Sequence, residues 1–265
     1  MTAAVAQEFA RIGFVNMLAF RLRYYTGVIT YLVNVTVYYF IWRAVFAASP
    51  AYGGFRFEEM ITYMAVGWII RSMYFNNIDV EMAEDILEGK ISMTMLKPAS
   101  VQGTYIARAM GESAFRLIML TVPATVAIAL IFPVRPPASA ACFAAFLPAM
   151  AGSVLVVAGL NFIVGTCAIS LKSILGLLRA KFWMQDLLSG LLVPMTMFPS
   201  PMREAMYWLP FEHIGFTPMM IYLGKLSAAG TARALALQWA WGLALLWLGA
   251  RFWNRMSRRI TIHGG

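Results

Sequence analysis

The sequence predicts an all-α integral membrane protein with six transmembrane helices. Hydrophobic residues make up 61% of the 265 residues and charged residues only 12%, which is about half the charged share of an average soluble domain. Apolar runs long enough to cross a bilayer recur along the chain. Lysine and arginine gather on alternate connections between those runs, as the positive-inside rule requires.

The N-terminal segment, residues 1–23, differs from the runs that follow because charges interrupt it. Phe9 and Ile12 alternate loosely with Glu8 and Arg11. This pattern predicts an amphipathic helix that lies in the inner membrane interface, with its arginines toward anionic head groups of the membrane lipids. A simple inward extension of the first span is the alternative.

Six runs have the composition of a membrane span, which takes roughly 20 mostly apolar residues. They cover residues 27–46, 60–77, 113–132, 138–171, 182–198 and 232–252. Aromatic residues border the first run at both ends, which is typical of membrane interfaces. The fourth run exceeds one bilayer thickness, so we expect it to tilt, bend or protrude. Residues 1–265 are expected to form a single transmembrane domain.

The distribution of charge predicts the orientation of the chain. If both termini are cytoplasmic, most of the 21 Lys and Arg residues lie on the inner side. The net charge of +9 therefore reflects membrane topology, and we expect no nucleic-acid partner. Cys142 and Cys167 are expected to be buried thiols. Neither they nor His213 and His263 form a metal-ligand pattern, so we expect no metal site.

A few polar residues fall within the apolar runs. We expect Arg71 to extend its charged end to the inner interface and Asn161 to bond a neighbouring helix. Asp186 begins the fifth run close to Lys181, which favours a local ion pair. The C-terminal arginines are expected to bind lipid head groups: Arg255, Arg258 and Arg259.

Residues 78–98 stand apart from the apolar runs around them, because they hold five of the chain's 12 acidic residues. Ile78, Met82 and Ile86 recur four residues apart and predict one apolar helix face. Gly89 fits the position after a helix end. The pattern predicts a short amphipathic helix in the cytoplasm. A docking surface for a partner and a helix that packs on its own chain are equally compatible with this periodicity.

Residues 198–225 predict a broken structure at the outer face. The segment contains four prolines and cannot form one continuous helix. It is also too apolar for a free loop. We expect a re-entrant hairpin of short helices, since non-helical backbone at membrane depth is tolerated only inside protein or beside water.

Two sequence blocks resemble signatures of type-2 ABC export permeases, in the six-span subgroup that includes viologen-exporter-like and daunorubicin-exporter-like permeases. The first block is DILEGKISMTMLKP, residues 85–98; Met95 replaces a leucine of the pattern and Lys97 replaces its usual arginine. The residues of this block that match are Asp85, Gly89, Ile91, Leu96 and Pro98. The second block is residues 187–225, matched at Gly190, Pro194, Phe198, Pro199, Leu209, Pro210, Phe211, Tyr222, Leu223 and Gly224.

The resemblance implies a permease subunit of an ATP-driven exporter in a bacterial inner membrane. Residues 78–98 would form a coupling helix that docks on a cytoplasmic ATPase. Two ATPase chains and a second permease, identical or related, would complete the transporter. ATP and Mg²⁺ would bind to the ATPase, which agrees with the lack of a G-x-x-x-x-G-K-[ST] loop in this chain. The expected coupling residues are Glu81, Glu84, Asp85, Ile86, Glu88, Gly89, Ile91, Leu96, Lys97 and Pro98.

The resemblance also implies a translocation path at the contact between two permeases. Its expected lining is Tyr38, Tyr63, Trp68, Met195 and Met197, whose rings and thioethers suit large apolar or cationic substrates. A role for these residues in the bilayer belt or core is equally compatible with their positions. The broken segment would act as an outer gate, with a purely structural plug as the alternative. Its expected gate residues are Phe198, Pro199, Trp208, Pro210 and Phe211.

Two other classes of protein are less compatible with the sequence. A membrane-embedded enzyme needs a convergent polar constellation, which the scattered histidines do not supply. An ion-coupled carrier, such as a drug/proton antiporter, normally shows inverted repeats and buried acidic residues, and we find neither. The carrier is the alternative function.

Overall fold

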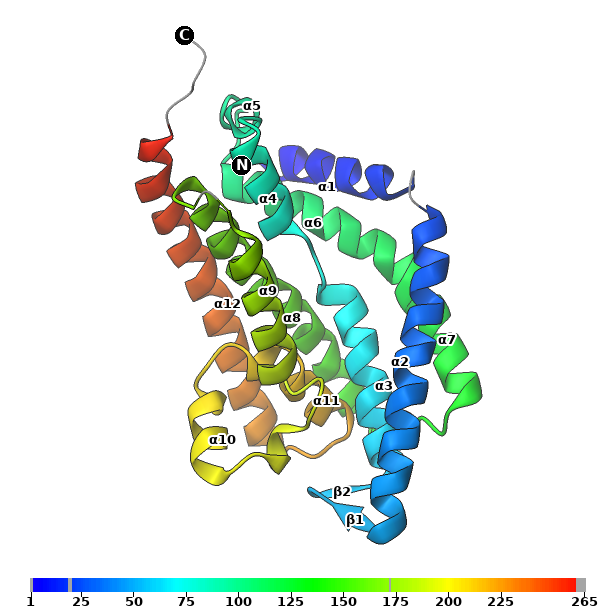
Figure 1. Ribbon diagram of the computed structural model, residues 1–265. Coiled ribbons are helices and arrows are strands. Elements are labelled where there is room, and N and C mark those ends of the chain that lie inside the picture. The colour runs from blue at the N-terminus through cyan, green and yellow to red at the C-terminus, as the bar shows by residue number, and fades with distance from the viewer. Residues whose placement is uncertain (1, 19–20, 172, 261–265) are drawn as a thin grey trace.

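The chain forms a bundle of helices with one small antiparallel hairpin (Figure 1). The computed structural model describes residues 2–18, 21–171 and 173–260. Residues 1 and 19–20 of the predicted N-terminal segment, and His263, lie outside the described residues. Helices α4 and α5 mark one end of the bundle and the hairpin marks the other. We call these the α5 end and the hairpin end.

The first part of the chain runs from the α5 end to the hairpin end and back. Its elements are α1 (Ala3–Leu18), α2 (Arg21–Ala48), β1 (Ala51–Tyr52), β2 (Phe55–Arg56) and α3 (Phe57–Tyr74). α1 lies across the α5 end, and α2 descends from it (Figure 1). Gly53 and Gly54 close the hairpin at φ +60° and +84°, which glycine adopts without steric cost. α3 returns through the centre of the bundle, where most of its side chains are buried.

The second part contains a long, bent helical run. Its elements are α4 (Ile78–Leu87), α5 (Ile91–Met95), α6 (Val101–Arg116), the π-helical turn η1 (Leu117–Thr121) and α7 (Val122–Ile131). η1 ends two residues before Pro123, which has no N–H and needs extra room in the turn before it. The sequence predicts a span that begins at residue 113, whereas the helix begins at Val101. The difference arises because charged residues interrupt the apolar pattern of α6.

α1 and α6 pack together at the α5 end at very short range. A Cβ atom at Gly111 would lie 1.8 Å from the carbonyl oxygen of Ala10, and one at Gly13 would lie 2.3 Å from that of Arg108. Two glycines on opposite helices therefore allow the backbones to touch. This contact holds α1 across the bundle as a separate helix.

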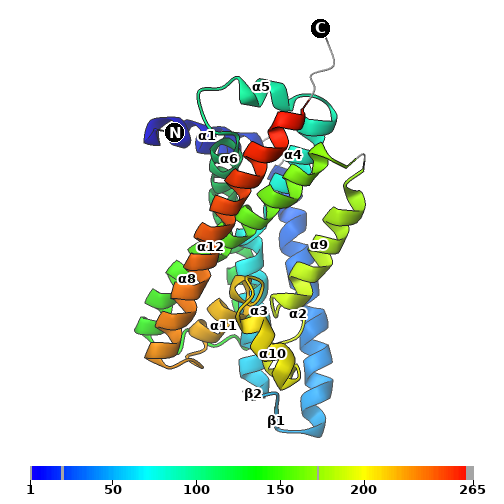
Figure 2. The ribbon, with the colours of Figure 1, turned by 90° about the vertical axis from the view of Figure 1, so that its left-hand side faces the viewer.

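The last part of the chain pairs two long helices and breaks the segment between them. Its elements are α8 (Ala140–Thr166), η2 (Cys167–Ile169), α9 (Leu175–Leu188), η3 (Met195–Met197), α10 (Ser200–Tyr207), η4 (Glu212–Ile214), α11 (Phe216–Tyr222), α12 (Ala228–Met256) and η5 (Ser257–Arg259). Figure 2 shows α8 and α12 side by side along much of their length. The predicted break in residues 198–225 is confirmed, since short helices replace one continuous helix there.

Within the described residues, three helices are long and apolar enough to cross a membrane: Tyr24–Ala48, Val101–Ile131 and Ala140–Ile169. The predicted class of all-α membrane protein agrees with them; six spans and a re-entrant hairpin stay predictions. The expected fifth span, residues 182–198, differs from the structure. Its helix, α9, begins earlier and ends at Leu188, because Gly190 follows at φ +77° and Pro194 interrupts the chain. Its 14 residues extend about 21 Å, less than the roughly 30 Å hydrocarbon core.

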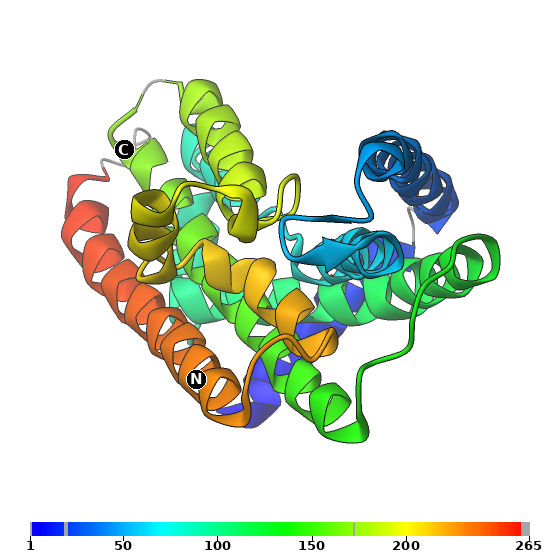
Figure 3. The ribbon, with the colours of Figure 1, turned by 90° about the horizontal axis from the view of Figure 1, so that it is seen from below.

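The main core lies where α3, α8 and α11 meet, toward the hairpin end. Its buried members include Met60 and Tyr63 of α3, Val156 of α8 and Met219 of α11. Figure 3, seen from the hairpin end, shows α11 near the centre, with α2, α3 and α7 to one side and α9, α10 and α12 to the other. The short helices of the broken segment therefore help to fill the bundle.

Candidate functional site

The outermost part of the α5 end is an exposed surface that mixes apolar and acidic side chains. Leu87, Met93 and Leu96 are large apolar residues with 54%, 67% and 81% of their surface exposed. Glu84 and Glu88 are exposed beside them on α4 and the turn after it. We call these five residues the apex. Clustered exposed apolar side chains are typical of a contact site for another protein.

The opposite side of α4 packs on its own chain. Ile78 and Met82 are fully buried in a cluster with Phe162 of α8 and Trp253 of α12. Ile86 is half-buried against the same cluster. The apolar stripe predicted from the sequence therefore seats α4 on the bundle, and the apex is formed by other residues. The expectation that Ile86 contributes to coupling stays a prediction.

Buried polar contacts tie the base of α4 to two other helices. Lys181 Nζ of α9 lies 2.6 Å from Asp79 Oδ2 in the first turn of α4, where Asp79 is almost fully buried. Lys181 also donates to Asn161 Oδ1 of α8 at 2.8 Å. Asn161 in turn donates to the carbonyl and side-chain oxygens of Asn76, at 3.1 and 2.9 Å. The expectation that Asn161 bonds a neighbouring helix is confirmed by its bond with Lys181 of α9.

A second buried ion pair joins α9 to α3. Arg71 Nη2 lies 2.9 Å from Asp186 Oδ2, and Arg71 Nε lies 3.3 Å from Asp186 Oδ1. The predictions for both residues are wrong: Arg71 does not extend to the interface, and Asp186 does not pair with Lys181. Residues five apart on a helix do not face each other, so Lys181 and Asp186 find different partners. Three rings also surround the Arg71 guanidinium, those of Trp68, Phe75 and Phe182, at 5.2 to 5.4 Å.

Further acidic residues of α4 face α6. The Tyr105 hydroxyl of α6 donates to the Asp85 carboxylate. Glu81 lies in a crevice with Glu112 and Arg108 of α6 and with Glu84. Burial, and then the nearby Glu112 carboxylate, raise the pKa of Glu81 from 4.5 to about 7. Half of the expected coupling residues are exposed: Glu84, Glu88, Gly89, Leu96 and Pro98. Four are half-buried, namely Glu81, Asp85, Ile86 and Lys97, and Ile91 is buried.

A cavity of about 390 Å³ lies between α1, α2, α3 and η1, on the α5 side of the bundle. Two guanidinium groups line it, those of Arg71 and Arg116. The Arg116 side chain donates to the carbonyl oxygen of Phe75 and lies 3.6 Å from the Glu112 carboxylate. The rest of the wall mixes hydroxyl, aromatic, amide and apolar groups: Met17, Tyr24, Thr26, Gly27, Thr30, Tyr31, Ser72, Phe75, Asn77 and Leu120.

The expected path residues lie in or against the main core. Tyr38 and Trp68 have ring centroids 6.3 Å apart, and Tyr31 meets Trp68 edge-on at 5.6 Å. Tyr63 and Met195 are fully buried in the core of this chain. Met197 is half-buried, and packs against Gly53 of the hairpin. Tyr63, Trp68 and Met195 belong to the main core cluster, and Tyr38 and Met197 pack against it, so the structure gathers all five residues around one core.

The expected gate residues lie at the hairpin end in mixed environments. Trp208 is 58% exposed and Phe211 is half-buried, while Pro210 is buried. Phe198 is half-buried and Pro199 is exposed. His213 anchors this region from inside: its Nε2 lies 3.0 Å from the Tyr207 carbonyl oxygen and its Nδ1 2.8 Å from the Thr217 hydroxyl. Gln238 of α12 donates to the His213 carbonyl oxygen.

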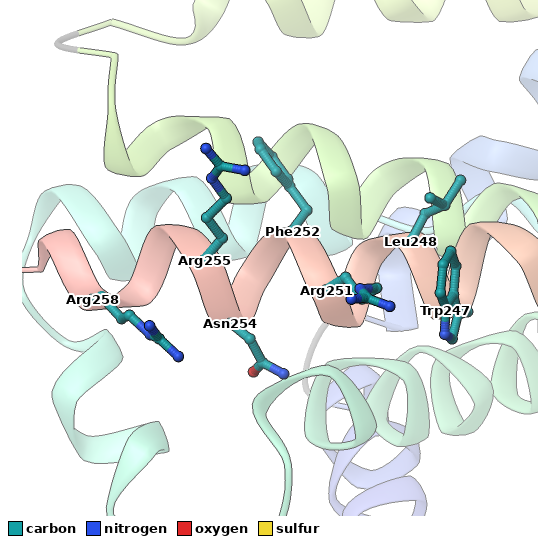
Figure 4. Close-up of a pocket in the computed structure, with 7 residues that line it drawn as sticks. All are labelled: Trp247, Leu248, Arg251, Phe252, Asn254, Arg255 and Arg258. Carbon is teal, nitrogen blue, oxygen red and sulfur yellow. The ribbon is translucent and has the colours of Figure 1, made fainter.

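A basic stripe follows the last turns of α12. Arg251, Arg255 and Arg258 are exposed, and none of them forms an ion pair within the part of the chain that the structure describes. Figure 4 shows Arg251 and Arg258 on one side of α12, with Trp247, and Arg255 on the other. Arg251 lies 4.9 Å from the centre of the Trp247 ring. The stripe borders a hollow of about 770 Å³, and its expected contact with lipid head groups stays a prediction.

Fold and site together define a class: a multi-pass helical membrane protein with an exposed apolar and acidic surface at one end of its bundle. A family model described as "ABC-2 family transporter protein" matches residues 32–264. The chain belongs to this family and is therefore a permease component of an ABC transporter, as the two sequence blocks indicate. Permeases of this family are membrane transport subunits that work with a cytoplasmic ATPase, which is a separate subunit. No curated protein matches the chain.

Proposed function

We propose that this permease belongs to an ATP-driven exporter and that the apex is the surface on which the ATPase docks. The observation that carries the proposal is the contrast between the two sides of α4. Exposed apolar and acidic residues lie on the apex side, whereas the other side is buried against the bundle and held there by the Lys181–Asp79 ion pair. A soluble partner would cover Leu87, Met93 and Leu96 and remove their apolar surface from water.

The two buried ion pairs beneath the apex could transmit a movement of α4 to other helices. Lys181 connects the first turn of α4 to α9, and Asp186 connects α9 to Arg71 of α3. A displacement of the apex by nucleotide-driven closure of the ATPases would therefore be carried to both helices. Such a two-permease, two-ATPase assembly would move an amphipathic or cationic small molecule or a lipid-like substrate outward, with the second permease identical or related.

The arrangement of the chain ends supports a cytoplasmic α5 end. α1 and the last turns of α12 both lie there, together with the basic stripe (Figures 1 and 4). By the positive-inside rule this end would face the cytoplasm, with the hairpin end on the outer side of a bacterial inner membrane. The broken segment of residues 198–225 would then act as the outer gate.

The test is recovery of the ATPase with the permease from native membranes in mild detergent, read by mass spectrometry. Leu96→Asp places a charge at the most exposed apolar residue of the apex and should abolish recovery without unfolding the chain. Tyr52→Asp is the matched control, since Tyr52 is also exposed but lies in the hairpin. Ile86→Asp is less informative, because it also disrupts the seat of α4.

Three results would decide the proposal. Normal ATPase recovery with Leu96→Asp would contradict docking at the apex. No ATPase with the wild-type chain, combined with transport that survives ATP depletion and collapses with a protonophore, would favour the ion-coupled carrier. A second permease in the wild-type sample would show a mixed pair, and its absence would favour a homodimer.

A further inference from the structure

We infer that the cavity between α1, α2, α3 and η1 binds the anionic head group of an amphiphile. The cavity's volume of about 390 Å³ falls within the usual range of small-molecule sites, roughly 300–1,000 Å³. Most of its lining comes from α2 and α3, with Arg116 and Leu120 from the bent run of α6 and η1. Met17 of α1 also lines it, so the cavity lies toward the α5 end, on the side where the inner leaflet would be.

The charge of the lining selects an anion. Arg71 and Arg116 both line the cavity, whereas the carboxylates that balance them, Asp186 and Glu112, do not. The bonds to Asp186 occupy the Nε and Nη2 atoms of Arg71 and use only part of the donors of a guanidinium. Guanidinium groups match phosphate and carboxylate oxygens in pairs of hydrogen bonds, so an anionic group is the complementary ligand.

The remaining lining selects a ligand with an apolar part. Tyr24, Phe75 and Leu120 contribute aromatic and aliphatic surface, and the hydroxyls of Thr30 and Ser72 lie among them. Beside the cavity, α2 and η1 carry exposed apolar side chains along which a tail could lie, including Ile29 and Ile118. A small inorganic anion would leave this surface unused. The two arginines also disfavour the cationic substrates that the nearby aromatic residues suggest from sequence alone.

Two sources can supply such a ligand: a resident phospholipid of the bilayer or an anionic amphiphile that the transporter moves. The second source rests on the proposed function and the first does not. The experiment therefore uses the purified permease–ATPase complex in lipid nanodiscs. The probe is phosphatidylglycerol with a photoreactive diazirine in one chain, and diacylglycerol with the same chain is the neutral comparison.

The expected result is that phosphatidylglycerol labels peptides of the cavity wall and diacylglycerol labels them weakly. Replacing Arg116 and Glu112 together by glutamine removes one guanidinium without leaving a buried charge unpaired. Labelling should then fall about tenfold, as expected for the loss of a charge-assisted hydrogen bond. Thr30→Phe should give a similar loss by filling the cavity. Val33→Phe, at an exposed site on the same helix, is the matched control and should label normally.

Addition of ATP and Mg²⁺ distinguishes the two sources. Unchanged labelling identifies a resident lipid, whereas labelling that falls as probe appears in the opposite leaflet identifies a transported one. Equal labelling by diacylglycerol, or full labelling of both the glutamine pair and Thr30→Phe, would overturn the inference. ATPase recovery and ATP hydrolysis in the same discs report separately on the proposed function, so loss of either without loss of labelling would contradict that function alone.

Discussion

Ion pairs join distant segments at both ends of the molecule, but their environments differ. At the α5 end, Lys181–Asp79 and Arg71–Asp186 are buried, with side-chain exposures of 15% and 4%, and of 12% and 8%. At the hairpin end, Arg135–Glu58 is about half exposed, at 47% and 53%, and Lys225–Glu59 is intermediate, at 21% and 23%. Exposed pairs contribute little, whereas breaking a buried pair leaves an uncompensated charge. Breaking either of the two buried pairs at the α5 end should therefore cost more stability than breaking Arg135–Glu58.

The sharpest test of this comparison is Lys181→Met, which leaves Asp79 buried and unpaired. We expect a loss of about 3–5 kcal/mol in the free energy of unfolding. Arg135→Met at the hairpin end is the matched change and should cost no more than about 1 kcal/mol. Denaturant unfolding of both variants in the same detergent measures the difference.

A double variant tests whether the loss of stability in Lys181→Met comes from the unpaired charge of Asp79 or from the changed shape of the side chain. Asp79→Asn combined with Lys181→Met removes both charges and should recover most of the loss, because no buried ion then lacks a partner. Equal losses for Lys181→Met and Arg135→Met would contradict the distinction between the two ends.

The sequence contains most of what is needed for the helices and little of what is needed for these pairs. Apolar runs place α2, α3, α7, α8 and α12 close to where they lie, because burial in lipid or core acts on each run separately. Arg71 and Asp186 are 115 positions apart, and nothing local indicates that they meet. Periodicity also finds the stripe of Ile78 and Met82, but it does not say whether a partner or the chain's own α8 covers it.

Charge within the α5 end should also make stability depend on pH. The pKa of Glu81 is raised from 4.5 to about 7 in the folded protein, by burial and by Glu112. Below pH 4.5 both the folded and the unfolded chain hold this proton. As the pH rises from 4.5 to about 7, the unfolded chain releases it more readily, so stability falls and then levels off.

Glu81→Gln removes this titration and should therefore be more stable than the wild type above pH 7, by roughly 1–2 kcal/mol after allowance for partial exposure. Thermal unfolding of both proteins between pH 4.5 and 8 measures this difference in stability. The difference should disappear at the acid end of the range. If the stability of Glu81→Gln and of the wild type changed with pH in parallel over the whole range, Glu81 would not be the cause of the pH dependence.

The smallest change in stability is expected at the hairpin end, from Trp208→Ala. The side chain is 58% exposed, and the bond that Trp241 donates to this residue goes to its backbone carbonyl oxygen, which the substitution keeps. Stability should therefore change by less than about 1 kcal/mol. ATPase recovery should also stay normal, since the apex lies at the other end.

The same variant tests the gate. If residues 198–225 form the outer gate, transport of substrate into inside-out vesicles should change in Trp208→Ala. The number of ATP molecules hydrolysed per substrate molecule transported should then rise. Tyr52→Ala, exposed at the same end but outside this segment, should leave both rates unchanged. Normal transport and a normal ratio of ATP hydrolysed to substrate transported in Trp208→Ala would favour the purely structural plug over the outer gate.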